Sequence, residues 1–328
     1  MYVPPADGQA DPDSVALLRR DPAEWALQRA RSPAWGNLVN ADLREANLRR
    51  AKLQDADLRG ANLAAADLTW ARLGRARLDG ATLHNATLRE AEFIEIALDR
   101  PVFENVDFKG ADLQYDRFPG ARFVDCDLRG VKFTEGTLAG AEFVRCQLDG
   151  VNFARVPMQG VKFVDSHMQT GGFGGCDLTG AELAFATPNQ IDFIDCNLTG
   201  VALPVQDWIS VSMIGTRFPP QKLDGRRIAG ANLTRTTLTG SSFRGARIIN
   251  TSLRDAHLGG CDFTNATIEH SFFDGADLTG ARFDGARFVR EVSFKGATLD
   301  GASFGGVTVD GAVVDLGGTV LDGKGLPK

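Results

Sequence analysis

The residues best suited to chemistry are five cysteines, four of which form two evenly spaced pairs. Cys126 and Cys146 lie twenty residues apart, and Cys176 and Cys196 repeat that spacing, while Cys261 stands alone. Cysteine can bind zinc, form a disulfide or act as a nucleophile, and what each thiol does depends on its surroundings. Two thiols without a histidine nearby supply too few ligands for zinc. The role of the pairs therefore depends on the elements that position them.

The histidines and carboxylates do not form a recognisable catalytic motif. We find neither an HExxH zinc motif nor a nucleophile elbow in the sequence. The four histidines stand at positions that the repeat described below directs outward: His84, His167, His257 and His270. We expect a protein that is not an enzyme and that uses no cofactor and no metal.

A period of five organises most of the chain. From Ala41 the sequence reads ADLRE ANLRR AKLQD ADLRG, with a large apolar residue at the third position of each five. Calling that residue the centre, i, the register holds from Leu38 to Phe288, and only Pro188 breaks it. The period is neither the 3.6 of a helix nor the 2 of a strand. It predicts a short extended piece followed by a turn, many times over.

Each position within the five has its own character. Position i−2 is small, as at Ala41 and Val131, and position i+2 is often glycine, as at Gly130 and Gly150. Glycine there supplies the positive φ of a tight turn. We expect i and i−2 to point inward, and i−1, i+1 and i+2 to point to solvent, where nearly all the charge lies.

This pattern resembles the pentapeptide-repeat family, whose consensus is A(D/N)LXX. The resemblance implies an all-β solenoid, a right-handed quadrilateral β-helix with four pentapeptides per coil and about 13 or more coils. Residues twenty apart would then stack directly on one another. From Phe123 to Phe173 the centres alternate phenylalanine with leucine or methionine. Two opposite faces should therefore stack phenylalanines inside the coil.

The coil gives the cysteines a simple interpretation. All five occupy position i−2, which elsewhere holds alanine, valine, serine or glycine. Stacked strands would hold the Cβ atoms of each pair about 4.8 Å apart, which is long for the roughly 3.8 Å of a disulfide. We predict that the cysteines fill the core as small apolar residues.

The first 35 residues depart from the repeat. We expect a flexible tail at 1–12 and a helical cap at 13–35. Asp21, Pro22 and Glu24 make a capping-box arrangement that predicts a helix over Pro22–Arg31. Such a cap would cover the first coil, whose bare edge invites aggregation. The β-helix is expected over 36–323, followed by a tail at 324–328.

The second departure covers residues 186–230, where the coil is expected to be distorted or to carry loops. Prolines and large polar residues stand where the repeat needs ladder donors or small side chains, including Pro188, Pro204, Gln206, Gln221 and Arg226. One hypothesis is a partner-binding site, because exposed tryptophan with arginine is typical of binding hot spots. Its candidate residues are Trp208, Met213, Phe218, Arg226 and Arg227. The alternative is that Trp208, Met213 and Phe218 are ordinary core centres.

The third departure is a one-residue slip at Arg290-Glu291. Centres resume at Phe294 and continue through Val309 and Val314. The sequence then ends without a closing helix, so the last coil is a candidate for stacking on a second copy, as a homodimer, or for cover by a loop.

Charge and composition narrow the function. The formal net charge is −6, and the N-terminal residues lack the features of a signal peptide. We expect a cytoplasmic protein that contacts neither nucleic acid nor membrane. The resemblance also implies an alternative, because some family members bind DNA gyrase by mimicking DNA. Full-length mimicry would need roughly one negative charge per 1.7 Å, so we favour an adaptor or scaffold that binds another protein.

Overall fold

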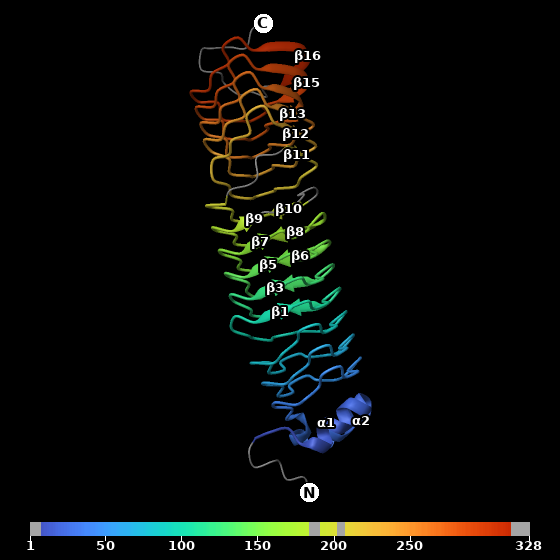
Figure 1. Cartoon of the computed structure of the whole chain (residues 1–328). Coiled ribbons are helices and arrows are strands. Elements are labelled where there is room, and N and C mark those ends of the chain that lie inside the picture. Colours follow the sequence, from blue (N-terminus) through green and yellow to red (C-terminus); the bar gives the residue numbers. More distant parts are fainter. Residues whose placement is uncertain (1–7, 184–190, 202–206, 316–328) are drawn as a thin grey trace. The chain divides into compact units, whose positions relative to one another are not determined.

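The computed structural model describes residues 8–183, 191–201 and 207–315 (Figure 1). The chain divides into two compact units, the first formed by Met1–Gly171 with Ala184–Pro188 and the second by Gly172–Leu183 with Asn189–Lys328. Each unit is a parallel β-solenoid, as predicted, and the first begins with helices. That residues 36–323 form a single domain stays a prediction, and the expected tail at 324–328 lies outside the described residues.

Three short helices form the N-terminus of the first unit: α1 (Pro12–Arg20), α2 (Pro22–Arg31) and the 3₁₀ helix η1 (Pro33–Gly36). Asp21 begins α2 by accepting hydrogen bonds at Oδ1 from the backbone N–H groups of Ala23 and Glu24, at 3.1 and 3.0 Å. These bonds satisfy N–H groups that the first turn of a helix leaves unpaired. The helix predicted from the capping box is thus confirmed.

The helices cover the first coil. Arg19 Nη1 donates to the backbone carbonyls of Asp42 and Arg44, at 3.0 and 3.1 Å. In later coils the corresponding carbonyls accept from the preceding coil, as Asn62 O does from Leu43 N at 2.8 Å. Because the first coil has no such predecessor, Arg19 supplies the missing donors. The helices therefore protect a sheet edge, as expected.

The coil contains twenty residues and has four pairing positions. The first coil pairs with the second at Asn37↔Asp57, Asp42↔Asn62, Asn47↔Asp67 and Lys52↔Arg72. Between these positions the chain turns at i+2, where φ is positive both for glycine, as at Gly60 (+65°), and for other residues, as at Asn40 (+56°). The turn expected from the glycine pattern is confirmed and is not restricted to glycine.

Short parallel strands extend some of these pairing positions. The strands of the first unit form two stacks, β1-β3-β5-β7 and β2-β4-β6, with bounds Val102–Glu104, Asp112–Gln114, Arg122–Val124, Lys132–Thr134, Glu142–Val144, Val151–Ala154 and Lys162–Val164 for β1 to β7. The remaining strands are β8 (Gly171–Gly174), β9 (Glu182–Leu183), β10 (Ile191–Ile194), β11 (Trp208–Ile209), β12 (Arg227–Ala229), β13 (Arg247–Ile249), β14 (Thr267–Phe272), β15 (Arg287–Ser293) and β16 (Thr308–Asp315).

The centres fill each unit as the alternation predicted. Phe123 and Phe143 stack at a centroid distance of 4.8 Å with an interplanar angle of 2°. Phe133 and Phe153 stack in the same way across the core, at 5.1 Å. Between the two stacks, Phe143 and Phe153 meet edge to face at 6.1 Å. Parallel stacking within a face and edge contacts between faces are favourable aromatic geometries.

The irregular region at 186–230 is only partly described. Pro188, Pro204 and Gln206 lie outside the described residues. Over 207–230 the coil continues, with pairs such as Arg217↔Thr237 and Lys222↔Ser242, and within that range no loop leaves it. The distortion expected there is confined to the side chains of Gln221 and Arg226, which are only half buried in a slot where small residues are fully inside.

The one-residue slip at Arg290-Glu291 is confirmed by the register of β14 and β15. Glu269 pairs with Val289, twenty residues on, whereas Ser271 pairs with Val292, twenty-one residues on. A second shift follows between β15 and β16. Val309, expected to point inward, is instead 42% exposed. Stacking of this end on a second copy stays a prediction.

Candidate functional site

The cysteines lie in the core, as the coil predicted. All five are buried free thiols. Cys126 Sγ donates to the Phe103 carbonyl at 3.3 Å, and Cys146 Sγ makes the equivalent bond to Phe123 one coil later, also at 3.3 Å. Burial raises the pKa of the Cys261 thiol to about 12, so its nucleophilic thiolate is scarce at neutral pH. The burial of all five thiols supports the interpretation that they fill the core.

The predicted partner-binding residues divide into a buried and an exposed group. Trp208, Met213 and Phe218 are only 2, 4 and 5% exposed, and the rings of Trp208 and Phe218 lie 5.8 Å apart. The alternative that they are core centres is therefore confirmed. Arg226 is half buried and Arg227 is exposed, with its backbone N–H donating to Asp207 Oδ1 at 2.9 Å. The structure does not bring the five together as one exposed patch.

An exposed tryptophan with arginines does occur, but in the first unit, at Trp70. This side chain is 45% exposed. Trp70 occupies the i+2 position after the buried centre Leu68, with φ of +58°. The turn directs its indole outward while its backbone N–H stays in the ladder, donating to Arg89 O at 2.9 Å. The Cζ atoms of Arg49 and Arg50 each lie 5.0 Å from the indole centroid.

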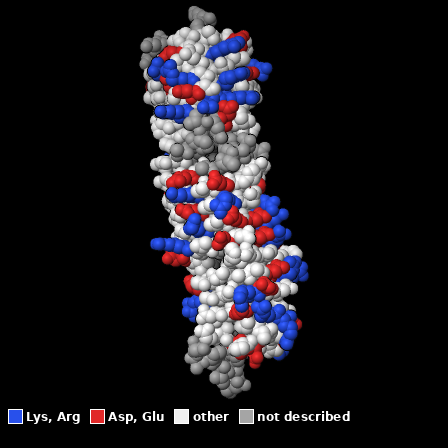
Figure 2. All heavy atoms as spheres, viewed as in Figure 1, with Lys and Arg blue, Asp and Glu red and all other residues white. Residues whose placement is uncertain are grey.

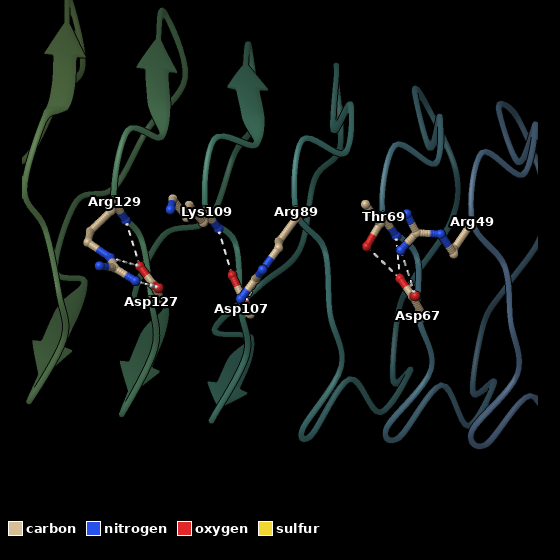
Figure 3. Close-up of polar contacts among 8 residues, drawn as sticks. All are labelled: Arg49, Asp67, Thr69, Arg89, Asp107, Lys109, Asp127 and Arg129. Atoms are coloured by element: carbon tan, nitrogen blue, oxygen red, sulfur yellow. Dashed lines mark hydrogen bonds and ion pairs between the residues drawn. The ribbon is translucent and has the colours of Figure 1, made fainter.

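A column of basic side chains continues from this tryptophan along the same face. Arg49, Arg89, Lys109 and Arg129 all occupy position i+1, and Thr69 takes that position in the remaining coil. An aspartate at i−1 accompanies most of these coils (Figure 3). We call this surface the Trp70 face, comprising Arg49, Arg50, Asp67, Thr69, Trp70, Arg89, Asp107, Lys109, Asp127 and Arg129.

Ion pairs fix the geometry of the Trp70 face. Arg49 Nη1 bonds to Asp67 Oδ2 at 3.0 Å, an ion pair that links consecutive coils. Arg89 reaches Asp107 in the same way, whereas Arg129 pairs with Asp127 of its own coil. Stacked like charges would repel, and the aspartates between them offset that repulsion.

The cations lie outside the carboxylates with which they pair. The side chain of Arg89 is 55% exposed, against 23% for Asp107. Burial opposes ionisation of Asp67, but hydrogen bonds from Thr69 and Arg49 outweigh it and hold the pKa of Asp67 below its usual value. Burial also opposes ionisation of Asp127, where hydrogen bonds from Arg129 lower the pKa. The face thus presents guanidinium groups and an indole over an anionic layer.

A shallow hollow marks the centre of the Trp70 face. It has a volume of about 500 Å³ and is lined by Arg49, Asp67, Thr69, Trp70, Thr87, Arg89, Glu90 and Lys109. Ligand sites commonly have volumes of this order. The hollow combines an aromatic wall with cations from consecutive coils, which suits recognition of an anionic and partly apolar group.

Sequence reasoning missed the Trp70 face although its own rule was sufficient. Position i+2 was expected to point outward, and Trp70 stands there. The functional hypothesis rested on departures from the repeat, whereas this tryptophan lies within a regular part of it. Asp116 was also missed. It occupies an inward i−2 slot, is 4% exposed, and accepts a hydrogen bond at Oδ1 from Ile96 N at 2.8 Å.

The surface of the first unit carries both charge signs. On the face seen in Figure 2, acidic and basic side chains are interspersed and neither forms an unbroken row. Arg122 and Glu142, for example, pair one coil apart at 3.0 Å. Among the described residues, no group of three or more histidines, cysteines or carboxylates is placed to hold a metal ion. In the same residues, no helix is long and apolar enough to cross a membrane.

The fold and the repeat define a class of protein, a β-solenoid built from five-residue units. Two family models, each described as "Pentapeptide repeats", match this sequence and together cover more than half of it. One matches residues 34–64, 66–100 and 126–165, and the other matches residues 227–272 and 273–320. The chain belongs to the pentapeptide-repeat family and is a repeat scaffold.

Solved structures of pentapeptide-repeat proteins are similar to the chain at low identity. Rfr23 from the cyanobacterium Cyanothece 51142 is 16% identical over 33% of this chain and 90% of its own, with a TM-score of 0.26. HetL from Nostoc sp. strain PCC 7120, involved in heterocyst differentiation regulation, is 20% identical over 89% of this chain and 96% of its own, with a TM-score of 0.18. QnrB1, a plasmid-mediated fluoroquinolone resistance protein, is 19% identical over 65% of this chain and 92% of its own, with a TM-score of 0.19. A search of curated proteins finds no significant match.

Proposed function

We propose that this protein is a non-enzymatic scaffold that binds another protein through the Trp70 face. The observation that carries the proposal is the indole of Trp70, 45% exposed, with Arg49 and Arg50 each 5.0 Å from its centroid. Tryptophan and arginine are the residues most enriched in binding hot spots. Cation–π contacts hold the indole in place before binding, which reduces the entropy lost on association.

The chemistry of the Trp70 face indicates the chemistry of the partner. Outward guanidinium groups at Arg89 and Arg129 suit carboxylates, which arginine binds with two parallel hydrogen bonds. The indole of Trp70 offers area for an apolar side chain. We therefore propose a protein partner whose surface carries aspartates or glutamates around an apolar residue. Asp67, Asp107 and Asp127 partly neutralise the cations, so the face lacks the continuous positive charge that binding of a phosphate backbone uses.

A comparison of variants tests this assignment. Trp70→Ala and Arg49→Ala should each reduce recovery of the partner about tenfold or more in a pull-down with purified tagged protein. Tyr115→Ala is the matched control, because Tyr115 is also an i+2 aromatic with positive φ and is 47% exposed, but lies outside the Trp70 face. Recovery of the same partners by all three variants at wild-type levels would remove the Trp70 face from consideration.

Arg226 and Arg227 remain predicted contact residues of the second unit. Arg227 in β12 pairs in register with Arg247 in β13, which places two cationic side chains on neighbouring strands. Like charges in adjacent strands are unfavourable, and an acidic partner would relieve them. Arg227→Ala in the same pull-down separates this contribution from that of Trp70.

Mimicry of DNA at gyrase is the alternative, and the interspersed surface charges of the first unit argue against it. Supercoiling of relaxed plasmid by gyrase, with and without a quinolone, distinguishes the two functions. We expect no change in the presence of micromolar protein. Inhibition or protection that Trp70→Ala leaves intact would favour gyrase and overturn the scaffold proposal.

We place the protein in the cytoplasm, because five free thiols suit a reducing compartment.

A further inference from the structure

The ladder of the first unit opens between two consecutive coils, and the opening has the features of a binding site. A cavity of about 480 Å³ lies between residues 78–84 of one coil and residues 98–104 of the next. All of these residues are described. In an intact coil the centre and the i+2 residue donate to the next coil, as Leu58 N does to Arg77 O at 2.8 Å and Gly60 N to Asp79 O at 2.9 Å.

Along the cavity, these interstrand bonds are missing. Within residues 76–104, the N–H groups of Leu78, Gly80 and Leu83 have no backbone partner in the coil that follows. In the same range, the N–H groups of Ala97 and Val102 find no carbonyl in the coil that precedes. The ladder is intact at both ends of the gap, where Arg75 N bonds to Ile94 O at 2.8 Å and Asn85 N to Glu104 O at 3.2 Å.

The sequence explains why the coils separate here. Pro101 occupies an i−2 slot, where other residues donate to the preceding centre, as Ala61 N does to Leu58 O at 3.0 Å. Proline has no N–H and cannot close that turn. Ile96 fills the preceding i−2 slot with a large side chain, and its N–H donates to Asp116 Oδ1 in the next coil. A bond of the same kind joins Cys146 N to Ser166 Oγ where the ladder is paired, so Pro101 is the change that is specific to the opening.

The walls of the cavity combine unpaired backbone groups with an apolar floor and an acidic rim. Leu78, Leu83 and Leu98 form the floor and are almost fully buried. Three carboxylates lie at the rim, on Asp79, Asp99 and Glu104, against one guanidinium, Arg100, which is 3.9 Å from Asp99. His84 also lies at the rim, 3.5 Å from Glu104. The rim favours a cationic ligand.

We propose that this cleft binds an extended peptide segment of a partner protein that carries a lysine or arginine. The backbone of the segment would pair with the unpaired N–H and C=O groups, as in other recognition by strand addition. Its basic side chain would be directed at Asp79, Asp99 and Glu104, and its apolar side chains at the leucine floor. A strand that pairs with these groups replaces loosely held solvent with directed backbone hydrogen bonds, which gives affinity in recognition by strand addition.

A small peptide tests the proposal directly. The probe is acetyl-Thr-Val-Lys-Val-Thr-amide, with its backbone N-methylated form as the matched control. We expect the probe to bind saturably, with a dissociation constant at or below about 1 mM by calorimetry. The N-methylated form should bind at least about tenfold more weakly. Backbone hydrogen exchange within 78–84 and 97–102 should be fast in the free protein and slow with the probe. Absence of binding, or slow exchange already in the free protein, would overturn the proposal.

Two variants separate the cleft from the rest of the fold. Pro101→Ala supplies an N–H and should close the ladder. Backbone hydrogen exchange in the free protein should then slow, and the affinity for the peptide probe should fall about tenfold or more. Asp99→Asn should weaken binding of the lysine-containing probe without changing backbone hydrogen exchange in the free protein. Pro157→Ala is the control, because it also adds an N–H in place of an exposed proline but lies outside the cavity, where the Pro157 carbonyl accepts from Leu138 N at 2.9 Å. Wild-type binding by Pro101→Ala with a closed ladder would contradict the proposal.

Discussion

The regions around Trp70 and Trp208 contain the same kinds of residue and use them in opposite ways. Each has a tryptophan near two arginines, yet Trp70 is 45% exposed and Trp208 is 2% exposed. The difference comes from position within the five, since Trp208 is a centre and Trp70 is an i+2 residue. In this fold the position in the repeat, and not the local composition, decides whether a side chain is core or surface.

The largest expected effect comes from truncating the two tryptophans. Trp208→Ala leaves a cavity in the core and should lower the free energy of unfolding by about 3–5 kcal/mol. Trp70→Ala removes only surface contacts and should lower it by less than about 1 kcal/mol. Urea denaturation followed by circular dichroism measures both. Equal losses of unfolding free energy in the two variants would show that position within the pentapeptide does not govern burial.

The same comparison can be made between aspartates. Burial raises the pKa of inward Asp116 to about 9, while a hydrogen bond from Ile96 N opposes the rise. The carboxyl of Asp116 has a pKa near 4 in the unfolded chain. Between pH 4 and about pH 9 the unfolded chain therefore releases this proton while the folded protein keeps it, so the free energy of unfolding falls as the pH rises. Asp116→Asn should remove this fall and stabilise the protein by about 1–3 kcal/mol at pH 8.

Outward Asp127 should show the opposite pH dependence. Its folded pKa is lowered, so its contribution is present above pH 4 and is lost as the pH falls through the folded value. Asp127→Asn should cost only about 0–1 kcal/mol at pH 8, because the ion pair is largely exposed. Melting temperatures of both variants at pH 4, 6 and 8 provide the measurement. A stabilising Asp127→Asn or a destabilising Asp116→Asn at pH 8 would contradict the assignment.

The smallest effect is expected for the stacked thiols. Replacing both Cys126 and Cys146 with alanine should lower the free energy of unfolding by about 1 kcal/mol per site or less and leave partner binding intact. In the native wild type, the buried thiols should not react with Ellman's reagent until the protein is denatured. Rapid reaction of the native protein, or loss of the partner from a stably folded double variant, would show that the thiols are more than core filler.

Most of the fold followed from the sequence because the repeat is redundant. An apolar centre every five residues and a small residue two before it specify coil size, inward positions and stacked phenylalanines many times over. The N-terminal helix was also predictable, since Asp21 satisfies N–H groups within its own segment. The expectation failed at Val309, which is exposed in β16, a strand whose pairing with β15 shifts register.

The candidate sites were less predictable for two reasons. Irregular composition pointed to residues 186–230, whereas Trp70 lies in a regular coil and is exposed because its i+2 position in the turn directs it outward. The opening at 78–104 consists of missing hydrogen bonds between consecutive coils. It therefore involves residues that are about twenty apart in the sequence, and the repeat pattern of a single pentapeptide does not reveal it.

The sequence by itself determined the repeat unit, the inward and outward positions and the family, because a period of five directly encodes the geometry of one coil. Only the tertiary structure decided which outward residues form a surface and where the ladder opens. The Trp70 face is assembled from position i+1 of successive coils, and the cleft from missing hydrogen bonds between coils. Both are properties of stacking, and stacking brings together residues that no single pentapeptide contains.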